Sequence, residues 1–193
     1  KVTAAALDIT IAGPAVGNVT ITMGATAVIN CYGSWTNAAT GVVVTGTSGA
    51  TISFLATATG KTVTTNNVTF TTMSINFNGV GGGWTLGSAF TNTTNGLTVL
   101  AGSFSTGNYS LSCIQLATSG TSTRSISLGS SAVTLAATTA VSISGTNLTF
   151  NAGTSTITCN GTTQTFAGGG QTFYNVSFTG TGTGNTTITG ANT

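Results

Sequence analysis

Very few side chains in this sequence could carry out acid–base chemistry. The chain has three cationic residues, one acidic residue and no histidine; the charged residues are Lys1, Asp8, Lys61 and Arg124. Hydrolysis of a glycosidic bond needs a pair of carboxyl groups, and Asp8 has no second carboxylate to work with. The many serine and threonine hydroxyls lack a histidine that would activate them. The sequence therefore predicts no enzyme, no catalytic residue and no cofactor.

Two glycine runs, residues 79–83 and 168–170, resemble phosphate-binding loops at first sight. Neither run is followed by the Lys-Ser/Thr pair of a P-loop, and neither begins a plausible helix. Glycine also permits the positive φ angles of tight turns. We therefore expect both runs to form corners between strands.

Three cysteines, Cys31, Cys113 and Cys159, lie far apart in the chain. They form no CxxC pair, so nothing supports a zinc site or another metal site. Free cysteine commonly behaves as a small hydrophobic residue in a protein interior. We expect these three to be buried, with at most one disulfide among them.

Two further residue classes could bind or carry sugars. Aromatic side chains could stack on sugar rings, although the interpretation we favour is that they fill the core or cap its ends; these residues are Tyr32, Trp35, Trp84, Tyr109 and Tyr174. Asn-x-Ser/Thr sequons for N-glycosylation occur at eight positions; their asparagines are Asn18, Asn67, Asn92, Asn108, Asn147, Asn160, Asn175 and Asn185. Because many sequons arise by chance in a Thr- and Asn-rich chain, no ligand-binding residue is assigned.

The composition indicates an all-β protein. Val, Ile, Thr and Phe suit a pleated, half-buried surface, whereas helix-favouring charged residues are nearly absent and glycine is frequent. Nucleic acid is not an expected partner, because phosphate binding requires clustered Lys and Arg. Membrane insertion is not expected either, because no run approaches the ~18 apolar residues of a spanning helix.

Short alternating strands separated by Gly, Asn and Ser turns follow one another along the chain, for example at residues 61–70, 73–77 and 83–86. Similar sequence segments recur along the chain: residues 97–103 resemble 148–154, residues 86–88 resemble 128–130, and residues 76–89 resemble 177–191. Spacings near multiples of about 20–25 residues are typical of solenoids. The sequence favours a parallel β-helix, or β-solenoid, of irregular short coils. The alternative is an antiparallel β-sandwich of one or two immunoglobulin-like units.

The repeated phrases divide the chain into two expected parts. Residues 1–60 form an N-terminal β segment, interpreted as a docking or capping module. Residues 61–193 form the repetitive β-solenoid, which we expect to continue beyond the chain end.

From Phe70 onward the sequence resembles the Gly/Thr-rich repeats of tailed-bacteriophage virion proteins, such as fibres and capsid or tail appendages, and it is similar to repeats of bacterial surface adhesins. The phrases that carry the resemblance are residues 77–86, 101–106, 123–130, 148–157 and 166–178. The resemblance implies a parallel β-helix, an exposed structural role and self-association. It carries no site residues across to this chain.

These observations lead to three hypotheses. The first is a structural protein on the virion surface, whose partners are its own copies, other virion proteins and host glycans. The second is a subunit of an extracellular filament or adhesin of a microbial cell. The third is an ice-binding protein, suggested by Thr-x-Thr pairs at 20–22, 62–64, 156–158 and 187–189. Because the spacing between these pairs is irregular, no uniform threonine ladder is expected from them.

Overall fold

The computed structural model describes residues 3–14, 17–38, 41–181 and 186–189, and these contain strands, turns and bends without any helix. The strands are β1 Thr3–Ala6, β2 Ile9–Ile11, β3 Val19–Met23, β4 Val28–Cys31, β5 Trp35–Asn37, β6 Val42–Phe54, β7 Lys61–Thr64, β8 Thr69–Leu86, β9 Phe90–Asn92, β10 Leu97–Ser105, β11 Leu111–Cys113, β12 Leu116–Thr118, β13 Arg124–Ser127, β14 Ala132–Leu135, β15 Thr139–Ile143, β16 Leu148–Asn151, β17 Thr156–Cys159, β18 Gln164–Ala167, β19 Asn175–Phe178 and β20 Thr186–Thr189.

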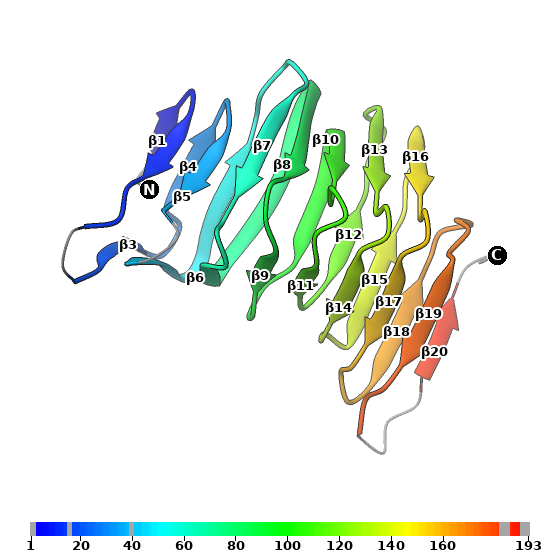
Figure 1. Ribbon diagram of the computed structural model, residues 1–193. Helices are drawn as coiled ribbons and strands as arrows, with labels where there is room; N and C mark the ends of the chain where they lie inside the picture. The colour runs from blue at the N-terminus through cyan, green and yellow to red at the C-terminus, as the bar shows by residue number, and fades with distance from the viewer. Residues whose placement is uncertain (1–2, 15–16, 39–40, 182–185, 190–193) are drawn as a thin grey trace.

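These strands stack as a parallel β-solenoid of about eight turns, seen in Figure 1 as successive coils from the blue N-terminal strands to the red β20. Except at the two ends of each ladder, a strand pairs in parallel with strands one turn before and one turn after it. The predicted β-helix is therefore confirmed. The antiparallel sandwich is wrong, because every pairing between the described strands is parallel.

The pairings form three ladders around the rod. Ladder 1 contains β1, β4, β12, β15, β18 and β20 together with parts of β6, β8 and β10. Ladder 2 contains β2, β5, β7, β13 and β16 together with the ends of β8 and β10. Ladder 3 contains β3, β9, β11, β14, β17 and β19 together with the starts of β6 and β8.

The turns differ in length although the ladders stay in register. In ladder 1, Leu97 pairs with Leu116, 19 positions further along, whereas Leu116 pairs with Val141, 25 positions further along. The difference is taken up at the corners and at register shifts, such as the one between Val99 and Ala101 in β10. Strand alternation is thus preserved while corner length varies.

The interior of the rod is built from the inward rows of the three ladders, because alternate residues of a strand point to opposite faces. In β8, for example, Met73, Ile75 and Phe77 are buried while Ser74 and Asn76 are partly exposed. Aromatic rings stack between turns in the N-terminal half. The rings of Phe54 and Phe77 lie parallel at 4.7 Å, and Trp84 meets Phe54 edge-on at 5.9 Å.

Buried hydroxyls line the corner between ladders 2 and 3. We call Thr65, Thr106, Ser131 and Ser155 the corner hydroxyls; all four are buried. Thr106 Oγ1 donates to Leu128 O at 2.8 Å, and Ser131 Oγ donates to Thr106 Oγ1 at 2.7 Å. Ser155 Oγ is buried without a hydrogen-bond partner among the described residues.

This contrast predicts opposite effects for two serine-to-alanine substitutions. Ser155→Ala should leave the free energy of unfolding unchanged or raise it by up to about 1 kcal/mol, because it removes a buried unsatisfied hydroxyl. Ser131→Ala should lower the free energy of unfolding by about 1 kcal/mol, because it removes a made hydrogen bond. Urea unfolding of the two variants beside the unmodified chain measures the difference. Equal losses in both would contradict the assignment of partners.

Two predicted strand boundaries are wrong. Residues 61–70 do not form one strand, because β7 ends at Thr64 and the chain turns at Asn66 and Asn67, whose φ angles are 50° and 64°. Conversely, residues 73–77 and 83–86 belong to the single strand β8, which passes from one ladder to the next around a corner. The first prediction overlooked the turn at Asn66 and Asn67, and the second took the glycine run at 79–83 for a break between two strands.

The described strands within the first 60 residues join the same ladders as the rest of the chain. β5 pairs with β7 through Trp35 and Val63, and β6 pairs with β8 through Ile52 and Ile75. The docking or capping role of this segment stays a prediction.

Candidate functional surface

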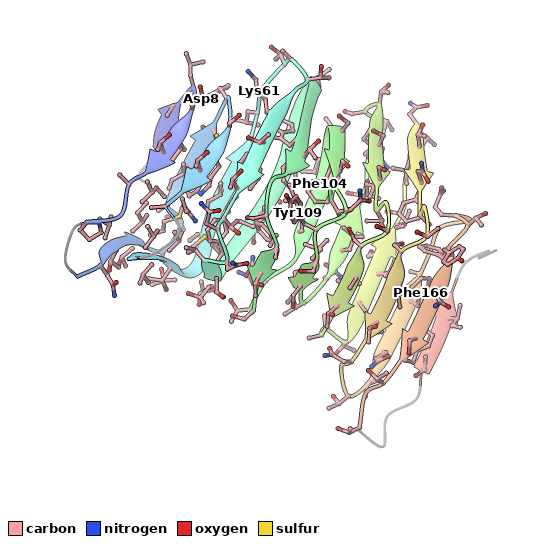
Figure 2. All side chains as sticks on the ribbon, viewed as in Figure 1. Asp8, Lys61, Phe104, Tyr109 and Phe166 are labelled. Atoms are coloured by element: carbon pink, nitrogen blue, oxygen red, sulfur yellow. The ribbon has the colours of Figure 1, made fainter. Side chains whose placement is uncertain are left out.

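The few charged side chains lie in different surroundings. Lys1 lies outside the described residues. Asp8 is exposed at the start of β2, where its carboxylate accepts a hydrogen bond from Ser34 N at 2.6 Å. Lys61 is half-buried at the start of β7, and Figure 2 shows Asp8 and Lys61 along the same long edge of the rod. No ion pair occurs within the described part of the chain.

Arg124 is buried, with 1% of its surface exposed. It begins β13, and its guanidinium reaches into the corner between ladders 1 and 2 of its own turn and of the next. The guanidinium donates to Thr118 Oγ1, to Gly120 O at 3.2 Å, to Ser122 O at 2.9 Å, to Thr146 O at 2.7 Å and to Ser144 O at 2.6 Å. Backbone carbonyls therefore stabilise this cation, and we call the set of acceptors the guanidinium cage. The residue clamps two successive corners together.

A groove of about 400 Å³ crosses the outer surface near this cage. It is lined by the corners of three successive turns, at residues 80–82, at Gly102 and Ser103, and at residues 122–125. The other residues that line it are Thr59 and Thr149. The groove offers hydroxyls and backbone atoms, which can form hydrogen bonds with a neutral ligand.

The glycine runs form corners, as predicted. Residues 79–83 lie where β8 passes from ladder 1 to ladder 2, and Gly81 has a φ angle of 76°. A side chain at Gly79 or Gly82 would collide with Ala56 O of the preceding turn. Residues 168–170 follow β18, where Gly169 and Gly170 have φ angles of 59° and 78°.

The five aromatic candidates divide into two groups. Trp35 and Trp84 belong to the core, as the core-filling interpretation expects. Tyr32, Tyr109 and Tyr174 are 41%, 44% and 65% exposed. These three rings are the ones left accessible to a sugar.

Ladder 3 carries an outward row of hydroxyl side chains, interrupted by Val43, that sequence reasoning missed. Residues facing outward on successive turns are Thr20, Val43, Thr69, Thr91, Ser112, Thr134, Thr158 and Ser177. We call them the outer row. A second row runs beside it in the first turns, where Thr22 pairs with Thr45 and Thr45 with Thr71. Thr71 Oγ1 donates to Thr45 Oγ1 at 2.9 Å.

The Thr-x-Thr pairs noted in the sequence do not all belong to this row. Pairs 20–22 and 156–158 lie on ladder 3, whereas 62–64 lies on ladder 2 and 187–189 on ladder 1. As expected, these pairs form no uniform threonine ladder. Ladder 3 instead carries a mixed row of Thr, Ser and Val43, because corners of different length bring these residues into register. The phrases Thr69-Phe70-Thr71 and Thr91-Asn92-Thr93, each with a buried central residue, were the available signal.

The sequons differ in accessibility. Asn92 is fully buried and donates through Nδ2 to Met73 O at 2.8 Å, so this amide could not receive a glycan in the folded chain. Asn185 lies outside the described residues. The exposed sequon asparagines are Asn18, Asn67, Asn108, Asn147, Asn160 and Asn175.

The three cysteines are free and buried, which confirms the expectation that they act as small core residues. Burial raises the pKa of Cys113 to about 12 and that of Cys159 to about 11, because the thiolate would lose its solvation. The pKa of Cys31 is raised for the same reason. All three thiols are therefore protonated near neutral pH, and reactive-thiol chemistry is not expected of them.

The raised pKa of Cys113 predicts a loss of stability in alkaline solution. Its contribution is fully present below the ordinary pKa of 9.0 and is lost as pH rises toward about 12, because only the unfolded chain releases the thiol proton in that window. Urea unfolding at about pH 8 and about pH 10.5 should show a smaller decrease for Cys113→Ala than for the unmodified chain. Identical decreases would refute the contribution of Cys113.

The described residues contain no group of three or more His, Cys, Asp or Glu that could hold a metal ion. No helix capable of crossing a membrane occurs among them. No family model, curated protein or solved structure matches this chain. The functional argument therefore rests on the surface itself: a hydroxyl-rich exterior, a groove lined by small residues and three exposed tyrosines.

Proposed function

We propose that this chain is a non-enzymatic structural protein of a virus particle, a segment of a phage fibre or of a capsid or tail appendage. The observation that carries the proposal is a rod of stacked parallel ladders whose outward rows are short, neutral side chains. The resemblance of residues from Phe70 onward to phage virion repeats supports the virion setting, and the similarity of the same residues to bacterial surface adhesin repeats supports the alternative.

The rod would present a rigid, uncharged β surface for assembly or host attachment. With one acidic and three basic residues in 193, neighbouring copies would pack without charge repulsion. Its partners would be copies of itself, other virion proteins and neutral host glycans, for which the groove and the exposed tyrosines offer hydrogen bonds and stacking surfaces.

Electron microscopy of material from the native source tests this proposal. We expect copies of the rod seated on a capsid or tail. A continuous polymer attached to no particle would reject the virion role and favour the alternative, a subunit of an extracellular filament or adhesin.

A second candidate function, ice binding, is favoured by one observation, the outer row of ladder 3. From Thr69 to Ser177 a hydroxyl recurs on every turn, at the separation of neighbouring strands, about 4.8 Å. The second threonine row widens the array in the first turns. If the chain binds ice, it should show thermal hysteresis. Thr69→Lys in the row should abolish it, and Thr98→Lys on ladder 1 should not. No hysteresis above buffer for the unmodified chain would reject this function.

A further inference from the structure

Three Asn-Gly steps occur in the chain, at 78–79, 95–96 and 160–161. We infer that Asn160 is a site of spontaneous covalent modification, deamidation through a succinimide, and that the fold protects Asn78 and Asn95 from the same reaction. The inference concerns the chemistry of the rod itself and holds whatever particle or cell carries it.

The reaction needs no enzyme. The Gly161 backbone nitrogen gives up its proton and forms a bond to Asn160 Cγ, and the bond from Cγ to the side-chain nitrogen breaks. Ammonia leaves, and a five-membered succinimide remains. Water then opens the ring at either carbonyl, so the net change converts asparagine and water into aspartate or isoaspartate and ammonia. No oxidant or reductant takes part.

The surroundings of Asn160 permit this attack. Asn160 is exposed and directly follows β17, and residues 160–163 form a bend outside any strand. Its backbone nitrogen donates to Leu135 O at 2.9 Å, but its side-chain amide has no hydrogen bond to the described residues. The Gly161 N–H has none to them either, although Gly161 O accepts a hydrogen bond from Gln164 Nε2 at 2.5 Å. The nucleophile and the carbon that it attacks are therefore both unrestrained by hydrogen bonds.

The other two steps are held by the fold. Asn78 lies inside β8 and pairs with Ala101, while Gly79 is buried and closely approached by Ala56 O. A paired strand does not allow the backbone rotation that ring closure needs. The Asn95 amide, oriented to satisfy both its ends, donates to Thr94 O at 2.8 Å and accepts from Met73 N at 3.1 Å.

Deamidation at Asn160 would change the surface charge of the rod. The formal net charge is +2 with a single acidic residue, so one event adds a second carboxylate on an exposed corner. Isoaspartate would also lengthen the main chain by a methylene in the turn that Gln164 closes through Cys159 O and Gly161 O. Ageing would thus lower the formal net charge of the rod from +2 to +1 and loosen one corner.

Peptide mass mapping during incubation in mildly alkaline buffer tests the inference. The sample is the purified chain produced without glycosylation, because Asn160 also lies in a sequon. In the folded chain, the peptide that contains Asn160 should gain the deamidation mass several-fold faster than those with Asn78 or Asn95. In urea, where the fold is lost, the three peptides should convert at similar rates.

Asn160→Gln is the matched variant, since it keeps an exposed amide at the same place. It should remove the fast conversion and leave the slow conversion at the other two sites unchanged. Conversion of Asn78 or Asn95 as fast as Asn160 in the folded chain would overturn the inference. So would an Asn160 peptide that converts only in urea.

Discussion

Replacing Arg124 with methionine should lower the free energy of unfolding by about 3–5 kcal/mol. The Arg124 side chain would lose its hydrogen bonds to the Thr118 hydroxyl and to four backbone carbonyls, of which Gly120 O keeps a second donor, Thr146 N at 3.0 Å. A hydrogen bond to a charged group contributes about 1.5–3 kcal/mol. Removing Arg124 also removes the free-energy cost of burying its charge. The backbone carbonyls that accepted its hydrogen bonds remain in place, because a side-chain substitution cannot remove them. The loss of hydrogen bonds therefore decides the sign.

Urea unfolding of Arg124→Met, followed by tryptophan fluorescence, measures this effect. Amide exchange should also accelerate at residues 119–123 and 144–147, the two corners that the guanidinium joins. Lys61→Met is the control, because Lys61 is half-buried and in the same ladder; its change should stay within about 0.5 kcal/mol. Arg124→Lys should still lose much of the stability, because an ammonium group cannot reproduce the planar set of donors. An Arg124→Met chain as stable as the unmodified one would refute the role of the cage.

The second large effect is expected for Gly102→Ala, among the residues that line the groove. Gly102 has a φ angle of 76°, and an added Cβ would lie 2.6 Å from Gly82 O and closer still to Gly79 O. The left-handed conformation costs a residue with a side chain about 1–2 kcal/mol, and overpacking costs about 1–3 kcal/mol. The free energy of unfolding should therefore fall by about 2–5 kcal/mol in total.

Gly60→Ala separates the two contributions. Gly60 has a similar φ angle of 79°, but nothing lies within 4 Å of an added Cβ. This variant should lose only the conformational part, about 1–2 kcal/mol. If both alanine variants lose the same stability in urea unfolding, the close approach of the two turns at Gly102 contributes nothing.

The alternation of apolar and hydroxyl residues was sufficient to predict strands and the solenoid, but not the position of each strand on the rod. The phrases beginning at Leu97 and Leu148 look alike, yet Leu97 lies in ladder 1 and Leu148 in ladder 2. The phrases at Leu86 and Leu128 do follow the same ladder 2. Any strand that alternates buried and exposed residues and ends in a glycine turn has a similar local sequence. The motif alone therefore does not identify the ladder to which the strand belongs.

The outer row and the surroundings of Arg124 also depend on which ladder each strand joins, and the sequence does not specify this. The outer row forms only when corners of unequal length bring Thr69, Thr91 and Thr134 into register, and no local pattern specifies those lengths. Arg124 is different, because a signal was present. It shares inward parity with Ile126 and Leu128 in the alternating segment, which predicts a buried arginine, although the carbonyls that satisfy it come from loops whose folding the sequence does not reveal.

The unequal turns have a consequence for how this protein can change over generations. Insertions and deletions normally damage a β-sheet because they shift its alternation, but here a length change at a corner leaves every paired residue where it was. The exposed corner of residues 57–60, where Gly60 faces open space, is one such place. Genes for this rod can therefore gain or lose codons at corners while purifying selection acts on the ladders, and the same corners are permissive positions for displaying a foreign peptide.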